Sequence, residues 1–175
     1  MKNISLWQLA GLTFTAVFGT LSHFLYTWTG CIALAPFCAV NESTWEHMKI
    51  LFFPMLVFAC IQNAFLGKKI GNFWLVKLAG IVLGVFAVPV LFYTYNGVFG
   101  SSPAWINVLI FFVAAALAYL FEAFLFSEEK PPRAVGIISL ITLCAFAVFF
   151  VLFTFIPPHI PLFQDPVTGL YGIVG

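Results

Sequence analysis

Apolar runs of about 20 residues recur along this chain, and each is long enough to cross the hydrocarbon layer of a membrane as a helix. Charged residues make up only 7% of the 175 residues, whereas a soluble domain has roughly 25%. The sequence therefore predicts an all-α fold, an integral membrane bundle of five transmembrane helices in one domain, residues 1–175. The predicted spans are residues 5–28, 44–66, 73–95, 103–126 and 134–156.

Basic residues predict the orientation of this bundle. The Lys and Arg residues that flank the spans fall on one side of it: Lys2, Lys68, Lys69, Lys77, Lys130 and Arg133. Because Lys and Arg concentrate in short cytoplasmic loops, the N-terminus is predicted to be cytoplasmic and the C-terminus extracytoplasmic. A net charge of +1 gives no reason to expect a nucleic-acid partner, and the expected partner is the lipid bilayer.

A polar cluster stands at the start of the second predicted span, where residues 41–49 read Asn-Glu-Ser-Thr-Trp-Glu-His-Met-Lys. Charged groups next to hydrocarbon are costly and often functional, so we interpret this cluster as the candidate site. With the predicted orientation it lies at the extracytoplasmic face. The other two histidines, His23 and His159, fall on the same side.

The imidazoles and carboxylates near this cluster indicate a possible chemistry. His23, Glu42, Glu46 and His47 are the predicted catalytic residues, and His23, His47 and His159 are the predicted metal ligands. Such groups are the usual ligands of zinc or another divalent metal, which could activate water to attack a lipid or lipid-linked substrate. Two other interpretations fit the same residues: an acid–base pair without a metal, and a hydrogen-bonded network that ties helix ends together.

Neighbouring polar and aromatic residues are predicted to bind the substrate: Asn41, Ser43, Trp45, Lys49, Tyr95 and Asp165. Some of them also have structural explanations. Ser43 and Glu46 fit a capping box, in which the Ser43 hydroxyl accepts the Glu46 N–H and the Glu46 carboxylate accepts the Ser43 N–H. Glu46 and Lys49 are spaced to form an ion pair on a helix, and Trp45 suits the membrane interface.

Two connecting segments have unusual compositions. Residues 29–40 are too apolar for a solvated loop and too few to cross the membrane, so they are expected to lie in the outer interface or over the bundle. Cys31 and Cys38 in this segment either form a disulfide or remain free apolar cysteines. Residues 157–175 combine turn formers with apolar residues and are predicted to fold back over the outer mouth, the alternative being a partly ordered terminus.

Glu122 is an acidic residue within an apolar span, near its predicted cytoplasmic end. It is expected either to pair with Lys68 or Lys77, or to act in a proton or ion relay together with Gln62 and Asn63. The relay would favour a different function, a small-solute transporter or channel. A subunit of a larger membrane complex is a third possibility, given the aromatic content of 19%.

Three motifs resemble a family of small bacterial and archaeal multi-pass membrane proteins of unknown function. They are Asn-Glu-Ser-x-Trp-Glu-His-x-Lys at residues 41–49, His-Phe-x-Tyr at residues 23–26, and Pro-Leu-Phe-x-Asp-Pro-x-Thr-Gly-x-Tyr-Gly at residues 161–172. The resemblance covers nearly the whole chain. It implies a multi-pass protein of the prokaryotic cytoplasmic membrane and assigns no activity. The sequence leaves open whether the chain is an enzyme, which metal it binds and whether it forms oligomers.

Overall fold

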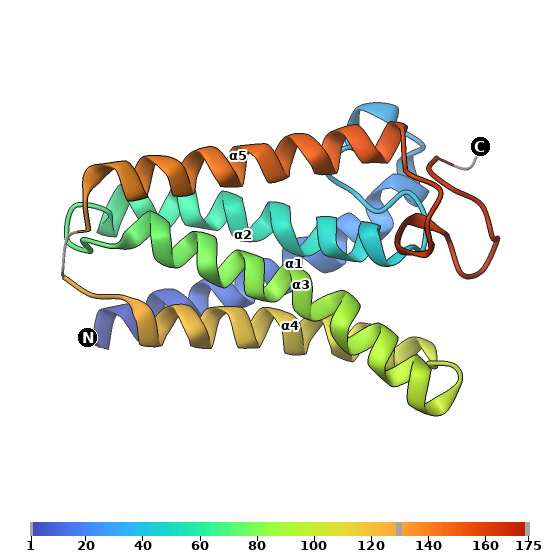
Figure 1. Ribbon diagram of the computed structural model, residues 1–175, viewed down its shortest axis with the longest axis horizontal. Helices are drawn as coiled ribbons and strands as arrows, with labels where there is room; N and C mark the ends of the chain where they lie inside the picture. The colour runs from blue at the N-terminus through green and yellow to red at the C-terminus, as the bar shows by residue number, and fades with distance from the viewer. Residues whose placement is uncertain (1, 129–130, 174–175) are drawn as a thin grey trace.

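Five long α-helices make up the bundle in the computed structural model, which describes residues 2–128 and 131–173 (Figure 1). They are α1 (Lys2–Thr29), α2 (Thr44–Leu66), α3 (Phe73–Phe99), α4 (Ala104–Leu125) and α5 (Arg133–Phe155). Two short 3-10 helices, η1 (Ile32–Leu34) and η2 (Pro161–Phe163), follow α1 and α5. Within the described residues no strand is found, and all five helices are long and apolar enough to cross a membrane. The predicted all-helical class and number of helices are confirmed.

The third helix extends beyond its predicted end at residue 95. It continues to Phe99 and stops at Gly100, whose φ of 85° is a conformation that glycine adopts without strain. The polar residues Tyr95 and Asn96 suggested an earlier end to the apolar run, but neither breaks a helix. The extension carries Asn96 on an ordered helix close to the start of α4.

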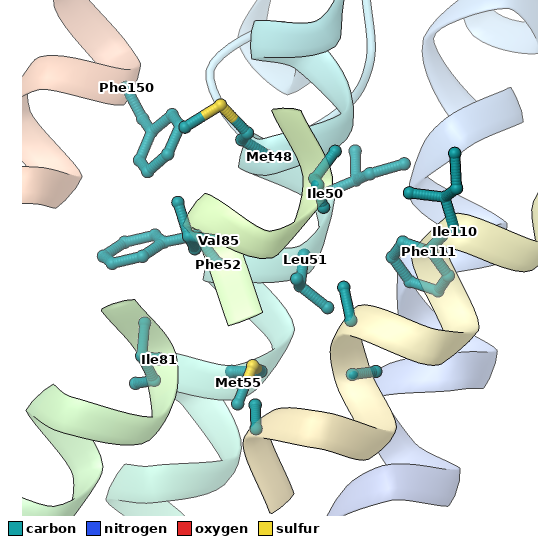
Figure 2. Packing of buried hydrophobic residues seen from close by; sticks show 14 of the residues in the cluster. Met48, Ile50, Leu51, Phe52, Met55, Ile81, Val85, Ile110, Phe111 and Phe150 are labelled. Carbon is teal, nitrogen blue, oxygen red and sulfur yellow. The ribbon is translucent and has the colours of Figure 1, made fainter. Parts of the chain in front are cut away.

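α2 lies at the centre of the bundle, packed against α1, α3 and α5, while α4 packs against α1 and α3. Buried residues of α2, α3, α4 and α5, among them Leu51, Ile81, Phe111 and Phe150, form one continuous apolar cluster (Figure 2). Small residues bring α3 and α4 close together, since a Cβ at Gly84 would lie 3.0 Å from the Ala118 Cβ.

The helix ends gather at two ends of the bundle (Figure 1). At the tail end, α1, α3 and α5 finish, α2 and α4 begin, and the C-terminal segment lies beside them. At the N-terminal end lie Lys2, Lys68, Lys69 and Arg133, with Lys77 one turn into α3. Lys130 falls outside the described residues. Apart from it and from Lys49, which lies near the start of α2 at the tail end, the basic residues share the N-terminal end. The direction of the bundle across the membrane stays a prediction.

The segment between α1 and α2 packs over the tail end. Its Ala39 N–H donates to the Ser22 carbonyl at 3.1 Å, and its Ala35 carbonyl accepts a hydrogen bond from Lys49 Nζ at 2.9 Å. Cys31 is exposed, Cys38 is buried, and both are free thiols, so the structure contains no disulfide between them. Hydrogen bonds to α1 and α2, rather than a cross-link, hold this segment in place.

The segment after α5 folds back on the start of α2. Phe163 of η2 is buried, with its ring centroid 4.6 Å from that of Trp45. The Asn41 side-chain amide donates to the Gly172 carbonyl at 2.8 Å. Asp165 Oδ1 accepts the Val167 N–H at 2.7 Å and thereby organises a turn. Residues 174 and 175 of the predicted tail lie outside the described residues.

Candidate functional site

The start of α2 is held by a cap that differs in part from the predicted capping box. The Ser43 hydroxyl accepts the Glu46 N–H at 3.4 Å, as predicted. The return bond to the Ser43 N–H was predicted wrongly, because the Asn41 side chain accepts that N–H at 2.9 Å. The Glu46 carboxylate instead accepts the Val40 N–H at 3.0 Å and pairs with Lys49 Nζ at 2.5 Å. The predicted Glu46–Lys49 ion pair is therefore confirmed.

Glu46 and Lys49 form a brace inside the bundle. Both side chains are buried, and Lys49 Nζ also donates to Thr154 Oγ1 of α5 at 2.8 Å. Together with the bond to Ala35, these contacts tie α2 to α5 and to the segment before it. Removing one partner of such a buried ion pair would leave an uncompensated charge inside the bundle, so the pair helps to hold these elements together.

The second polar group, which we call the His–Glu triad, consists of His23 from α1, Glu42 from the loop and His47 from α2. His23 Nε2 lies 3.5 Å from Glu42 Oε2, and His47 Nε2 lies 3.7 Å from the same oxygen. One ligand atom from each residue lies within 4.8 Å of the other two. The Glu42 side chain is 49% exposed, so the triad is accessible from outside the bundle. The structure brings together three of the four predicted catalytic residues.

The hydrogen bond of His47 determines which of its nitrogens faces the triad. His47 Nδ1 lies 2.9 Å from the Ser43 carbonyl oxygen, which can only accept a hydrogen bond. Nδ1 therefore carries the proton, and a neutral His47 presents the lone pair of Nε2 toward the Glu42 carboxylate. A backbone carbonyl that orients an imidazole in this way is the usual second partner of a metal-binding histidine.

Glu42 supplies negative charge to this group. The adjacent His23 imidazole lowers the pKa of the Glu42 carboxyl below its usual value, and this effect outweighs partial burial, which acts in the opposite direction. The carboxylate is consequently ionised at neutral pH. An ionised carboxylate beside the lone pair of His47 is a favourable arrangement only when a proton or a cation lies between them.

A cavity of about 680 Å³ adjoins the triad. His23, Glu42 and His47 lie on its wall, but most of the lining is apolar and comes from α1 and α4, including Phe24, Val108, Phe111 and Phe112. The sequence predicted a site made of polar residues, whereas most of the lining of this cavity is apolar. The prediction was based on polar residues at the ends of the helices, whereas the cavity is also lined by apolar residues of these helices.

A smaller cavity of about 20 Å³ lies between the triad and α4. Glu42, Thr44, His47 and Asn107 contribute polar groups to its lining. A cavity of roughly 10–15 Å³ or more, with polar partners, is enough for one water molecule. The space is thus suited to a single water beside Glu42 and His47.

Three further polar residues line the large cavity together with the triad and were absent from the predicted site. Asn96 Nδ2 donates to Ser102 Oγ at 3.2 Å, and Ser102 Oγ donates to Asn107 Oδ1 at 2.7 Å. We call them the amide wall; all three line the large cavity. A polar amide one turn inside an otherwise apolar run was the available sequence signal for Asn107.

The remaining predicted residues are not members of the triad. His159 packs against Tyr171 with ring centroids 4.6 Å apart, so it is not one of the converging ligand groups within the described parts of the chain. Trp45 packs against Phe163, and Tyr95 packs against Phe99 with centroids 4.7 Å apart. Asn41 and Asp165 hold the C-terminal segment in place, as described above.

Lys68 and Lys77 were the two predicted partners of Glu122, and in the structure Glu122 pairs with Lys77. Lys77 Nζ lies 2.5 Å from Glu122 Oε2, which also accepts a hydrogen bond from Gln8 Nε2 at 2.6 Å. Gln62 Nε2 donates to Gln8 Oε1 at 3.0 Å and so extends the network. These four side chains are buried, and none of them lines either cavity near the triad.

Comparison with known proteins places the chain in a family without assigning it an activity. The model of the Family of unknown function (DUF6512) matches residues 1–173, so the chain belongs to this family. No curated protein matches the chain, and no solved structure matches it either. Functional inference must therefore come from the geometry of the site.

Proposed function

We propose that this chain is a multi-pass membrane enzyme that binds zinc or another divalent metal at His23, Glu42 and His47 and hydrolyses, or transfers a group from, a lipid or lipid-linked substrate. The observation that carries the proposal is the convergence of the three ligand atoms beside a large apolar cavity. Two imidazoles and one carboxylate are a ligand set that catalytic zinc sites use, with one position left for water.

The polarity of the triad supports a cation rather than a chain of hydrogen bonds. Because Ser43 fixes the tautomer of His47, His47 has no proton on Nε2 to donate to Glu42. A divalent ion would accept lone pairs from both imidazoles and from the carboxylate, and so would satisfy all three groups at once. An acid–base pair between His47 and Glu42 without a metal would require His47 to be protonated on both nitrogens.

A bound metal ion would supply Lewis-acid activation of water and of the substrate oxygen. The residues of the chain would position the attacking water. The small cavity beside Glu42 and His47 has room for the attacking water, and Asn107 also lines that cavity. In hydrolysis, the water oxygen forms a bond to the ester carbon or phosphorus, the bond to the leaving oxygen breaks, and the proton lost by the water goes to that leaving oxygen.

We further propose that the tail end faces the extracytoplasmic side of a prokaryotic cytoplasmic membrane. The basic residues at the N-terminal end support this orientation through the positive-inside rule. The substrate would then come from the outer leaflet.

Elemental analysis of the purified, folded protein tests the metal site. Wild-type protein prepared with zinc present should contain about one equivalent of metal per chain. The double variant His23→Ala/His47→Ala should lose it, whereas His159→Ala, which removes an imidazole packed on Tyr171, should retain it. A folded wild type that stays free of metal after zinc is supplied would contradict the proposal.

A second candidate function is small-solute transport. The observation in its favour is the buried Glu122 network, because intramembrane carboxylates often belong to ion pathways. The apolar residues between this network and the triad, such as Leu51 and Met55, argue against a hydrated path through one chain. Transport would therefore require a path between several copies of the chain.

A further inference from the structure

We infer that the large cavity beside the His–Glu triad is a site for one acyl chain of a membrane amphiphile, whose polar headgroup lies between the triad and the amide wall. This inference rests on the proposed function for the class of ligand, a lipid, but it needs no metal ion. Beyond the proposed function, the inference specifies where the acyl chain and the headgroup lie and which residues contact them.

The lining of the cavity matches an amphiphile. The polar groups of the triad and of the amide wall, Asn96, Ser102 and Asn107, line it and come from parts of the chain near the tail end. The rest of the lining is largely apolar, with Gly19 and Phe24 from α1 and Ile50 from α2. A small polar solute would leave this apolar surface without a matching partner, whereas a chain of methylene groups would fill it.

The cavity also opens where a lipid can enter. Phe24, Val108 and Phe112 of α1 and α4 line it and are 44%, 57% and 38% exposed, so the cavity is open beside these two helices. Both helices are long and apolar enough to cross the membrane, so these exposed faces would contact lipid directly. An acyl chain can therefore pass sideways from the bilayer into the cavity without crossing water.

The hydrogen bonds of the amide wall indicate what the headgroup must offer. They run from Asn96 through Ser102 to Asn107 Oδ1, so the Asn107 side-chain NH₂ is the free donor of the series. Across the described ranges, 2–128 and 131–173, no residue accepts a hydrogen bond from it. A headgroup with acceptor oxygens, such as an ester, a carboxylate or a phosphate, would pair with this donor and with a cation at the triad.

The headgroup, not the chain, should determine affinity. Moving an acyl chain from the bilayer into an apolar cavity exchanges one apolar environment for another, so it gives little net hydrophobic gain. The polar contacts at the triad and at Asn107 are new to the ligand. Binding should thus weaken when either wall is altered, while the location of the chain is set by the shape of the cavity.

Photo-crosslinking of the full chain in lipid nanodiscs tests the location of the chain. The probe is palmitic acid with a diazirine in the middle of its chain, and the labelled peptides are mapped by mass spectrometry. We expect labelling concentrated on residues 19–24 and 108–112. Val108→Trp should fill the cavity and reduce this labelling several-fold. Val148→Trp, at a similarly exposed valine of α5 outside the cavity lining, should leave it unchanged.

The outcomes separate this inference from the proposed enzyme. Labelling spread evenly over all exposed helix faces, or unaffected by Val108→Trp, would overturn the acyl-chain site. If Val108→Trp does not fold, Thr20→Trp fills the cavity from α1 and takes its place. The variant His23→Ala/His47→Ala should be labelled less, because one polar wall is altered, but at the same residues, even though it lacks metal. Localised labelling in a protein that never binds metal would preserve the lipid site and refute the metal-dependent chemistry.

Discussion

Lys77 and Glu122 form an ion pair at 2.5 Å between α3 and α4, with both side chains buried. Three aromatic rings surround the ammonium group, those of Phe73, Tyr119 and Phe126, at 5.3 to 5.9 Å from Nζ to the ring centroids. Such cation–π contacts stabilise a cation that is removed from water. The pair thus joins α3 to α4 near the N-terminal end, far along both helices from the triad.

Removing one charge of this pair should be more harmful than removing both. Lys77→Met leaves Glu122 as a buried, uncompensated carboxylate and should lower the free energy of unfolding by about 3–5 kcal/mol. The double variant Lys77→Met/Glu122→Leu should be clearly more stable than Lys77→Met. Denaturant unfolding in detergent measures both values. A single variant as stable as the wild type would show that the pair does not hold α3 and α4 together.

Gly19 is predicted to be required for helix packing, in contrast to Gly97. A Cβ at Gly19 would lie 3.0 Å from the Ile50 carbonyl oxygen and would overlap the Phe111 ring, whereas no atom lies within 4 Å of a Cβ at Gly97. Gly19→Ala should therefore destabilise the protein by about 1–3 kcal/mol. Gly97→Ala should be neutral or stabilise it by up to about 1 kcal/mol, because alanine favours the helix.

The same unfolding measurement compares the two alanine variants directly. Each adds one methyl group to a helix, so a difference between them reports the local space and not the chemistry of the change. Equal stability of the two variants would mean that α1 does not pack closely on α2 and α4 at this point.

Hydropathy alone predicted the helices well, because each apolar run had to be long enough to cross a membrane and was bounded by turn formers or charges. Helix periodicity also predicted the Glu46–Lys49 ion pair, since residues three apart share a helix face. Both are local properties of the chain. For Glu122 the sequence left two possible partners, Lys68 and Lys77, because it does not give the position of α3 relative to α4.

Local sequence patterns were not sufficient to predict which residues come together in the site. His23 and His47 meet because α1 and α2 are rotated so that both imidazoles face Glu42, and sequence does not give that rotation. His159 belongs to the same end of the bundle, but the path of the C-terminal segment places it on Tyr171. Asn107 was missed because its importance depends on where the α3–α4 hairpin lies.

Phe163 is predicted to anchor the C-terminal segment on α2. Its ring is buried between Trp45 and Phe153, at centroid distances of 4.6 Å and 5.5 Å. Phe163→Ala should remove this anchor at a cost of about 3–5 kcal/mol. Leu170→Ala, at an exposed residue of the same segment, should have little effect.

Limited proteolysis detects whether the C-terminal segment detaches from α2 when this anchor is removed. The Phe163→Ala protein should be cleaved within residues 157–173 faster than the wild type, while the Leu170→Ala protein should be cleaved at the wild-type rate. Slow cleavage of the Phe163→Ala protein would indicate that the bond from Asn41 to Gly172 holds the segment by itself.

Cysteine labelling tests both the packing of the segment before α2 and the proposed orientation. Cys31 is exposed and Cys38 is buried. Burial also raises the pKa of the Cys38 thiol, so at neutral pH it holds even less of the reactive thiolate than an ordinary cysteine. A membrane-impermeant maleimide applied to intact cells at neutral pH should modify Cys31 and leave Cys38 unmodified. Cys31→Ser should abolish the labelling, and modification of Cys31 in inverted vesicles but not in intact cells would show that the tail end faces the cytoplasm.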